Sequence, residues 1–241
     1  SDLELFLKDL ELDGLILCCK ALATENIIID VRESEGEEGI KPKVTPVRVE
    51  SIENLNKDII KMILKLPGDE NLKFKAGQYI EFIMADNSRR AFSLANPPHE
   101  DYLELHLRLI EGRKFTQFVF NEMKEKSIHR IEAPIGELYL RESEKPIIFV
   151  AGGTGFAPVK SIIEDMIFNN IKRPIFLYRG VGKFDDLYMH NLSLEWANTL
   201  DEFSYIPVSQ TGLEKSDKLR MGLVHDAVLQ DFKSLGNVQV Y

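Results

Sequence analysis

Residues 151–158 read Ala-Gly-Gly-Thr-Gly-Phe-Ala-Pro and separate two segments with different residue patterns. Before them, residues 146–150 form a short apolar run that predicts a buried strand. After them, residues 159–168 have the amphipathic spacing of a helix. A glycine turn between a strand and a helix lets the backbone approach a pyrophosphate closely, and the helix N-terminus supplies unpaired N–H groups. The residues expected to hold a nucleotide here are Gly152, Gly153, Thr154, Gly155 and Pro158, the last in the first helical turn. The alternative is an ordinary glycine-rich turn.

The remainder of residues 146–241 alternates strand-like and helix-like stretches, which predicts a doubly wound parallel sheet. We expect strands at 147–150, 175–178, 203–208 and 238–241, and helices at 159–168, 192–200 and 224–232. Ligands of such sheets bind at the carboxyl ends of the strands. Tyr178 and Arg179 end the second strand and Ser209 ends the third, so we expect these residues near the nucleotide.

Residues 44–145 instead follow a period of two for most of their length. We expect strands at 44–52, 59–66, 79–85, 90–94, 103–109 and 128–133, and one helix at 115–123. Short strands separated by turn residues predict a small antiparallel barrel. The chain is therefore expected to hold a barrel domain at 44–145 and an α/β domain at 146–241.

A second motif lies in this barrel region, where residues 89–96 read Arg-Arg-Ala-Phe-Ser-Leu-Ala-Asn. Together the two motifs resemble the ferredoxin–NADP reductase superfamily, and the resemblance runs from about residue 44 to residue 241. That family pairs an FAD-binding barrel carrying Arg-x-aromatic-Ser/Thr with a pyridine-nucleotide domain opening on Gly-Gly-Thr-Gly-x-x-Pro. The resemblance implies an antiparallel Greek-key β-barrel followed by an α/β doubly wound parallel sheet.

The resemblance assigns flavin-binding roles to Arg90, Ala91, Phe92 and Ser93. Arg90 can form a charge-assisted fork with the FAD pyrophosphate. Phe92 follows on the same side of a strand and could cover the ribityl chain or the ring. Ser93 is implied to lie near flavin N5 and is our candidate catalytic residue. The family usually has Tyr where this chain has Phe92. The alternative is a strand with a surface arginine and a core phenylalanine.

A third segment, residues 106–116, resembles the family strand and helix that contact the flavin from the other side. In that family the backbone of the strand contacts the isoalloxazine, and the following turn holds the pyrophosphate. Thr116 is a possible N-cap, which would leave free N–H groups facing an anion. A capped surface helix with two solvated cations is the alternative. The residues implied are His106, Leu107, Arg108, Gly112, Lys114, Phe115 and Thr116.

The choice between NADH and NADPH rests on residues near the end of the third α/β strand. In the family, reductases strict for NADPH commonly place an arginine there to meet the 2′-phosphate. Gln210 carries no charge, whereas Arg220 or Arg179 could supply one. We favour NADH on the strength of Gln210.

Composition excludes several classes of protein. The 241 residues carry a net charge of -9 and have a pI of about 5.2, whereas a nucleic-acid binder usually presents a basic face. No apolar run approaches the roughly 18 residues of a membrane span, and residues 1–9 lack a signal-peptide pattern. We expect no nucleic-acid or membrane partner and a cytoplasmic location. The five histidines show no metal-ligand spacing.

Residues 1–33 resemble the tail of a plant-type ferredoxin domain, and residues 34–43 read as a charged, glycine-containing linker. In this resemblance Cys19 would be the leftover fourth ligand of a 2Fe–2S cluster. Such a cluster needs four thiolates, so this chain cannot hold one by itself. The alternative is that Cys18 and Cys19 are buried small hydrophobes. At the other end, the family loop that contacts nicotinamide would follow Tyr241 and is expected to be missing.

The sequence thus predicts an FAD-dependent oxidoreductase that takes a hydride from NAD(P)H. The reductases that it resembles place a ferredoxin domain with a 2Fe–2S centre ahead of the flavin domain, and they include those that act with sugar 3-deoxygenation enzymes and those that feed bacterial oxygenases. The acceptor is expected to be a redox partner protein or free flavin. Two alternatives are a flavin reductase that uses flavin as its substrate and a non-catalytic module that binds nucleotide or senses redox state.

Overall fold

The computed structural model describes residues 22, 24, 25, 27, 28, 40–68, 71–211 and 219–241. The chain divides into two compact units, Ser1–Glu35 and Gly36–Tyr241. Cys18 and Cys19 lie outside the described residues, so the resemblance of residues 1–33 to a ferredoxin tail stays a prediction. In the described part of the chain, no helix is long and apolar enough to cross a membrane.

The first half of the larger unit is an antiparallel sheet that closes on itself. Its strands are β1 (Lys43–Asn54), β2 (Ile59–Lys65), β3 (Tyr79–Ile83), β4 (Arg89–Ser93), β5 (Leu103–Arg108) and β6 (Ile128–Ile135), in the order β4-β3-β6-β1-β2-β5. An antiparallel bridge from Leu94 to Leu105 and a 2.8 Å bond from Ala95 N–H to the Glu104 carbonyl join the two edges. The predicted barrel is therefore confirmed, with every strand in its expected place.

Apolar side chains at alternate positions of these strands fill the interior of the barrel. Met62 and Leu64 of β2, Phe82 of β3, and Leu105 and Leu107 of β5 are buried in one cluster. Helix α2 (Lys114–Asn121) follows β5 and adds Phe115 to the same cluster. Because successive side chains of a strand point to opposite faces, every second residue of β5 is left to face outward.

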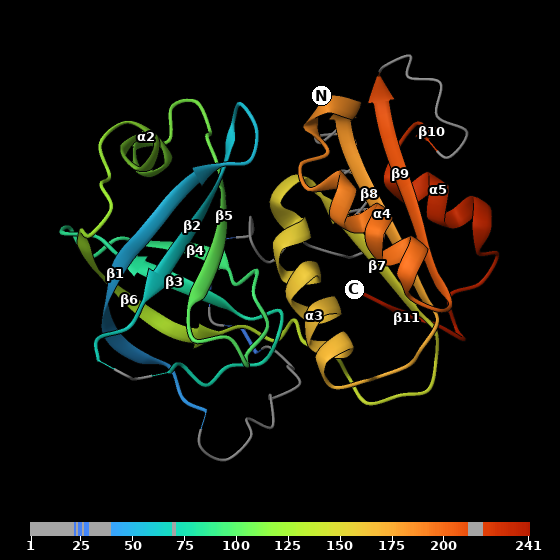
Figure 1. The fold of residues 1–241 in the computed structure, drawn as a ribbon, viewed down its shortest axis with the longest axis horizontal. Coiled ribbons are helices and arrows are strands. Elements are labelled where there is room, and N and C mark those ends of the chain that lie inside the picture. The colour runs from blue at the N-terminus through green and yellow to red at the C-terminus, as the bar shows by residue number, and fades with distance from the viewer. Residues whose placement is uncertain (1–21, 23, 26, 29–39, 69–70, 212–218) are drawn as a thin grey trace. The chain divides into compact units, whose positions relative to one another are not determined.

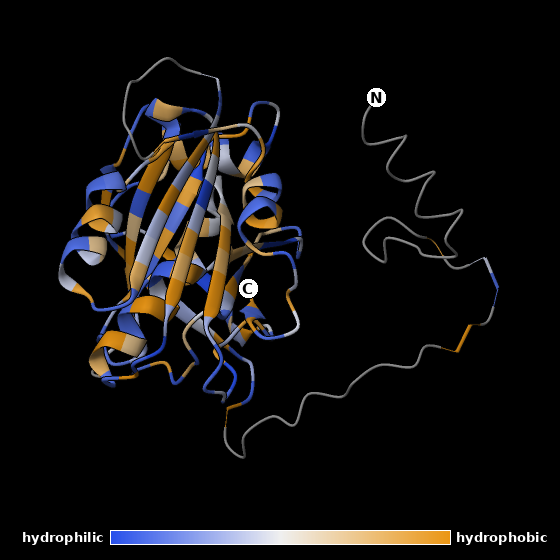
Figure 2. Cartoon of the chain, turned by 90° about the vertical axis from the view of Figure 1, so that its right-hand side faces the viewer, coloured by the Kyte–Doolittle hydropathy of each residue, from blue (hydrophilic) through white to orange (hydrophobic). Residues whose placement is uncertain are grey.

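The second half is a parallel sheet of the strands β7 (Ile147–Gly152), β8 (Ile175–Lys183), β9 (Phe203–Thr211), β10 (Arg220–Met221) and β11 (Gln239–Val240), in the order β10-β9-β8-β7-β11. Helices α3 (Phe156–Phe168) and α4 (His190–Thr199) cover one face, and α5 (Val224–Asp231) covers the other. Figure 2 shows the apolar residues that line these strands. The predicted α/β fold is confirmed, while the short strand β10 was not expected.

The two sheets meet through α3, which lies on the side of the parallel sheet that faces the barrel (Figure 1). The helix begins directly after a single 3-10 turn, η1 (Gly153–Gly155), which contains the glycine motif. The glycine turn is therefore placed between the carboxyl end of β7 and the barrel strand β5.

Candidate functional site

A pocket of about 350 Å³ lies at the carboxyl ends of β7, β8 and β9. Gly152 and Gly153 line it from β7 and η1, and Gly180 and Gly182 line it from β8. Gln210 and the first residues of α5 complete the wall. This is the edge where open α/β sheets bind ligands, and walls without side chains expose main-chain atoms to a nucleotide.

Two of these glycines occupy places that a side chain would disturb. Gly153 has a φ of 50°, and a Cβ there would lie 3.1 Å from Nη1 of Arg108. A Cβ on Gly180 would lie 2.7 Å from Cβ of Val224, so β8 and α5 could not approach as they do. The pocket therefore depends on glycine for both its backbone path and its width.

Arg108 of β5 also lines this pocket. Within the part of the chain that the structure describes, its buried Nε forms no hydrogen bond, and neither do the buried Oδ1 of Asp58 and Nδ2 of Asn56. Arg108 Nε lies 3.1 Å from Asp58 Oδ2 in an ion pair, but the angle does not make a hydrogen bond. Arg108 is the residue among these three that lines the pocket, so its guanidinium is in position to meet a polar ligand there.

The other residues predicted for the nucleotide lie outside the pocket lining. The hydroxyl of Tyr178 donates to Asp231 at 2.6 Å, and Arg220 forms an ion pair with the same carboxylate at 2.8 Å. Arg179 is 2% exposed, donates to the Tyr188 carbonyl at 2.7 Å and stacks 3.7 Å from the Phe156 ring centre. The Ser209 hydroxyl donates to the Thr211 carbonyl. Their roles in nucleotide binding stay predictions.

The neighbouring arginines of the flavin motif have different surroundings. Arg89 pairs with Glu81 at 3.0 Å and also with Glu132. Arg90 is exposed and donates to the Arg89 carbonyl at 2.7 Å, and it forms no ion pair with any carboxylate of the described residues. An exposed guanidinium without a carboxylate partner is free to bind an anionic group, so Arg90 fits an FAD pyrophosphate.

Phe92 connects this motif to the segment expected on the other side of the flavin. Its ring centre lies 5.4 Å from that of Phe115 at the start of α2, and both rings pack on Phe82. Through this ring contact, β4 lies beside the start of α2. Gly112 has a φ of 76° and open space around it.

Thr116 does not cap α2. The helix begins at Lys114, its N-cap is Arg113, and no side chain caps it. The Thr116 hydroxyl instead donates to the Arg113 carbonyl at 3.1 Å and accepts from the N–H of Ile110 at 3.2 Å. The prediction of an N-cap was wrong because this hydroxyl closes the preceding turn.

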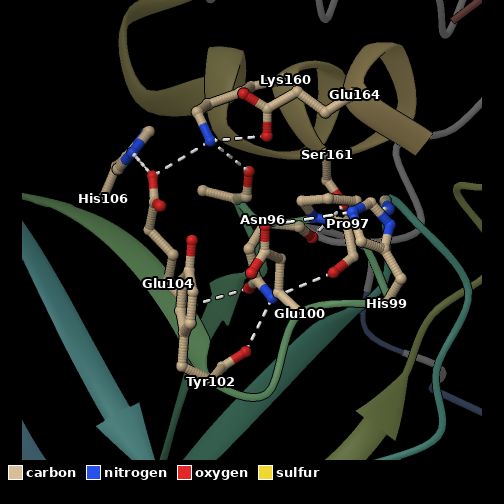
Figure 3. Close-up of polar contacts among 12 residues, drawn as sticks. Asn96, Pro97, His99, Glu100, Tyr102, Glu104, His106, Lys160, Ser161 and Glu164 are labelled. Carbon is tan, nitrogen blue, oxygen red and sulfur yellow. Dashed lines mark hydrogen bonds and ion pairs between the residues drawn. The ribbon is translucent and has the colours of Figure 1, made fainter. Parts of the chain in front are cut away.

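His106 was expected to contribute backbone contacts, but its side chain belongs to a buried polar network (Figure 3). Nε2 lies 2.8 Å from Glu104 Oε1, and Nδ1 lies 3.0 Å from the hydroxyl of Tyr188. Burial lowers the pKa of His106, and this effect outweighs the hydrogen bond to Glu104. Glu104 and Lys160 were not among the residues expected here, because the sequence alone does not show that Glu104 on the outward face of β5 meets Lys160 of α3.

Comparison with known proteins places two domain families on these two halves. An oxidoreductase FAD-binding domain matches residues 46–139, and an oxidoreductase NAD-binding domain matches residues 149–241. The chain is 37% identical over 229 residues to CDP-6-deoxy-L-threo-D-glycero-4-hexulose-3-dehydrase reductase of Yersinia pestis, covering 95% of this chain and 69% of the relative. It is 36% identical over 181 residues to reductase component 1 of terephthalate 1,2-dioxygenase of a Comamonas species, covering 74% and 53%.

Among solved structures, the cytochrome P450 reductase GcoB of Amycolatopsis is similar with a TM-score of 0.74 and 28% identity. The similarity covers 83% of this chain and 61% of that chain. The relatives named above are reductases or reductase components that work with partner proteins.

Proposed function

Because the chain belongs to the ferredoxin–NADP reductase superfamily and is an FAD-dependent NAD(P)H oxidoreductase, we propose that its electrons pass to a redox partner protein. The observation that carries the proposal is the order of its two matched domains, together with relatives that serve a dehydrase and a dioxygenase. The chain spans 69% and 53% of those two relatives, so the identity of the acceptor belongs to the proposal.

Each half of the chain has its own role in this proposal. Arg90 and the N-terminal turn of α2 would hold the FAD pyrophosphate, and Ser93 would lie near the reactive edge of the flavin. The glycine turn 152–155 would hold the nicotinamide nucleotide. FAD, when bound, supplies a group that accepts two electrons as a hydride and can hand them on singly. The protein provides position, since hydride transfer needs reacting atoms held about 3–3.5 Å apart.

NADH is the proposed reductant. Arg220 is paired with Asp231 and Gln210 is uncharged, so neither residue offers a free positive charge to a 2′-phosphate. The same proposal includes an FAD-binding domain at 44–145 and a nucleotide-binding domain at 146–241. It also includes a cytoplasmic location, where NADH is available.

An anaerobic titration tests this function. The purified protein should carry flavin absorption near about 370 and 450 nm through gel filtration, and NADH should bleach these bands at lower concentration than NADPH. A flavin that leaves during gel filtration would support the alternative in which free flavin is the substrate. Bound flavin that NADH does not bleach would overturn the proposal in favour of a non-catalytic module.

A further inference from the structure

The outward face of β5 carries three polar side chains at alternate positions, and each contacts a different part of the α/β half. Glu104 lies 3.3 Å from Nζ of Lys160 in α3. His106 bonds to Tyr188, which precedes α4. Arg108 reaches the glycine turn, where its Nη1 lies 3.1 Å from the position of a Cβ on Gly153. One strand of the barrel therefore contacts α3, the segment before α4 and the glycine turn.

Lys160 is the most buried cation in this contact that has a carboxylate partner, with 5% of its surface exposed. Its ammonium donates to the Ala95 carbonyl at 3.1 Å and to Glu164 at 2.8 Å, and it pairs with Glu104. An ammonium has three donors, and all three are used. Two of the three acceptors belong to the barrel, so the lysine joins the two halves of the chain.

The next residue of α3 makes the same connection. The Ser161 hydroxyl donates to the Asn96 carbonyl at 2.6 Å and accepts from the N–H of Gly77 at 3.3 Å. The Asn96 side chain in turn accepts from the N–H of Glu104 at 2.8 Å and donates to the Tyr102 carbonyl at 2.7 Å. The backbone that presents Glu104 to Lys160 is thus held by side chains within the barrel (Figure 3).

The charges in this network are mutually consistent. Burial raises the pKa of Glu104, but the hydrogen bond from His106 and the Lys160 ammonium together outweigh it and leave that pKa below its usual value. Burial lowers the pKa of His106 and raises that of Tyr188. A neutral His106 can therefore donate Nε2–H to ionised Glu104 and accept the Tyr188 hydroxyl at Nδ1. Each bond has a donor and an acceptor, so the network has one preferred arrangement.

We propose that Lys160 is a positioning residue that fixes the glycine turn against the barrel for hydride transfer. Helix α3 begins at Phe156, directly after the turn Gly153–Gly155, so an anchor at the second turn of the helix limits movement of the glycines. A displacement of about 1 Å can cost roughly 100-fold in rate. The proposal rests on the function proposed above, because it assigns Lys160 to that same reaction.

The first test is Lys160→Met, which keeps an unbranched side chain, one atom shorter, and removes its charge. Flavin reduction at saturating NADH, followed anaerobically by stopped flow, should slow by about tenfold or more. FAD retention, and the rate at which dithionite-reduced flavin passes electrons to a dye, should stay as in the original protein. Lys65→Met is the matched control, because Lys65 pairs at the surface with Asp101 at 3.9 Å and should leave all three readouts unchanged. Equal slowing of both half-reactions would overturn the proposal.

A second variant separates positioning from stability. Lys160→Met leaves Glu104 buried without its cation, so it should lower the melting temperature, and adding Glu104→Gln should restore most of that loss. We expect the double variant to remain slow in flavin reduction. Recovery of both stability and rate would show a merely structural role and overturn the proposal.

A third readout does not depend on turnover. Amide hydrogen exchange of residues 153–162 should become faster in Lys160→Met and in the double variant, and unchanged exchange would overturn the proposal. If NADH fails to bleach the flavin of the original protein, the proposed function fails, while the exchange experiment still decides whether Lys160 anchors the turn.

Discussion

At the scale of single residues, adjacent arginines show how tertiary partners decide chemistry. Arg89 and Arg90 have the same side chain and are both exposed, but only Arg89 has carboxylate partners. The sequence motif could place Arg90 in a flavin site by resemblance. It could not show that Glu81 of β3 and Glu132 of β6 would pair with Arg89, because this depends on the register of three strands.

The contrast gives a matched pair of variants. Arg90→Ala should weaken FAD binding by about 1.5–3 kcal/mol, the range for a hydrogen bond to a charged group. Arg89→Ala should change FAD affinity much less, because its guanidinium is already held by Glu81 and Glu132. Titration of the flavin-free protein with FAD measures both affinities, and an equal loss in the two variants would remove Arg90 from the site.

The same limit applies to the residues predicted beside the nucleotide. Arg179 was expected near the nucleotide because it lies at the carboxyl end of a strand, but its neighbour Gly180 and not Arg179 lines the pocket. That position did not predict which face of β8 carries the guanidinium. The side chain is buried against Phe156 and the Tyr188 carbonyl, and that outcome depends on how α4 packs.

At the scale of elements, the strands and helices were predictable because burial of one face makes apolar residues recur at regular intervals along the sequence. β2 alternates buried and half-buried residues, β5 alternates leucines with polar residues, and each helix of the α/β half has one apolar face. The two-residue strand β10 is too short to show a period, and the 3-10 turn η1 has no sequence pattern of its own. The N-cap prediction for Thr116 was wrong because a threonine hydroxyl can form a hydrogen bond within a turn as well as cap a helix.

The glycine turn yields a prediction at this scale. Gly153 has a φ of 50°, where a side chain costs about 1–2 kcal/mol, and its Cβ would also crowd Arg108. Gly153→Ala should therefore lower the free energy of unfolding by about that amount. Gly155 has a φ of -60° and nothing within 4 Å of a Cβ position, so Gly155→Ala should not destabilise the protein. Chemical denaturation of both variants measures the difference, and similar losses would contradict the strain argument.

At the scale of the whole molecule, the contact between the halves combines apolar packing of Ile59 and Ala76 with a buried polar network. The sequence predicted two domains, but not that Glu104, His106 and Lys160 would meet between them. Residues far apart in the chain give no joint signal in one sequence, and a buried charge looks the same as a solvated one until its partner is known. The interface is therefore the part of the fold that needed the structure.

This interface makes stability depend on pH. The buried His106 has a lowered pKa, so the unfolded chain takes up more protons than the folded one once the pH falls below the usual histidine value of 6.5. The stabilisation is fully present above that pH and is lost as the pH falls toward the folded pKa. The charged and titratable groups that face this ring are Glu104, Lys160, Arg179 and Tyr188.

The melting temperature should therefore drop between pH 7.5 and 5.5, and His106→Gln should show a smaller drop. Burial in the barrel also lowers the pKa of His129. His129→Gln is therefore the control that measures how much of the drop in melting temperature comes from His129. An unchanged pH dependence in His106→Gln would show that the interface does not titrate in this range. The raised pKa of Glu164 favours the folded state only at lower pH, nearer its usual value of 4.5.

The contacts of α3 also bear on the exchange of domains between related reductases. Lys160 and Ser161 bind the main-chain carbonyls of Ala95 and Asn96, and every amino acid supplies a carbonyl. A foreign barrel whose chain follows the same path would offer these two acceptors whatever its side chains are. Glu104 is the barrel residue whose side chain Lys160 needs, so a hybrid has to keep a carboxylate at that position. Hybrids that keep this position acidic should join the two halves in the original alignment, whereas hybrids that lose it should leave a lysine buried against a neutral strand.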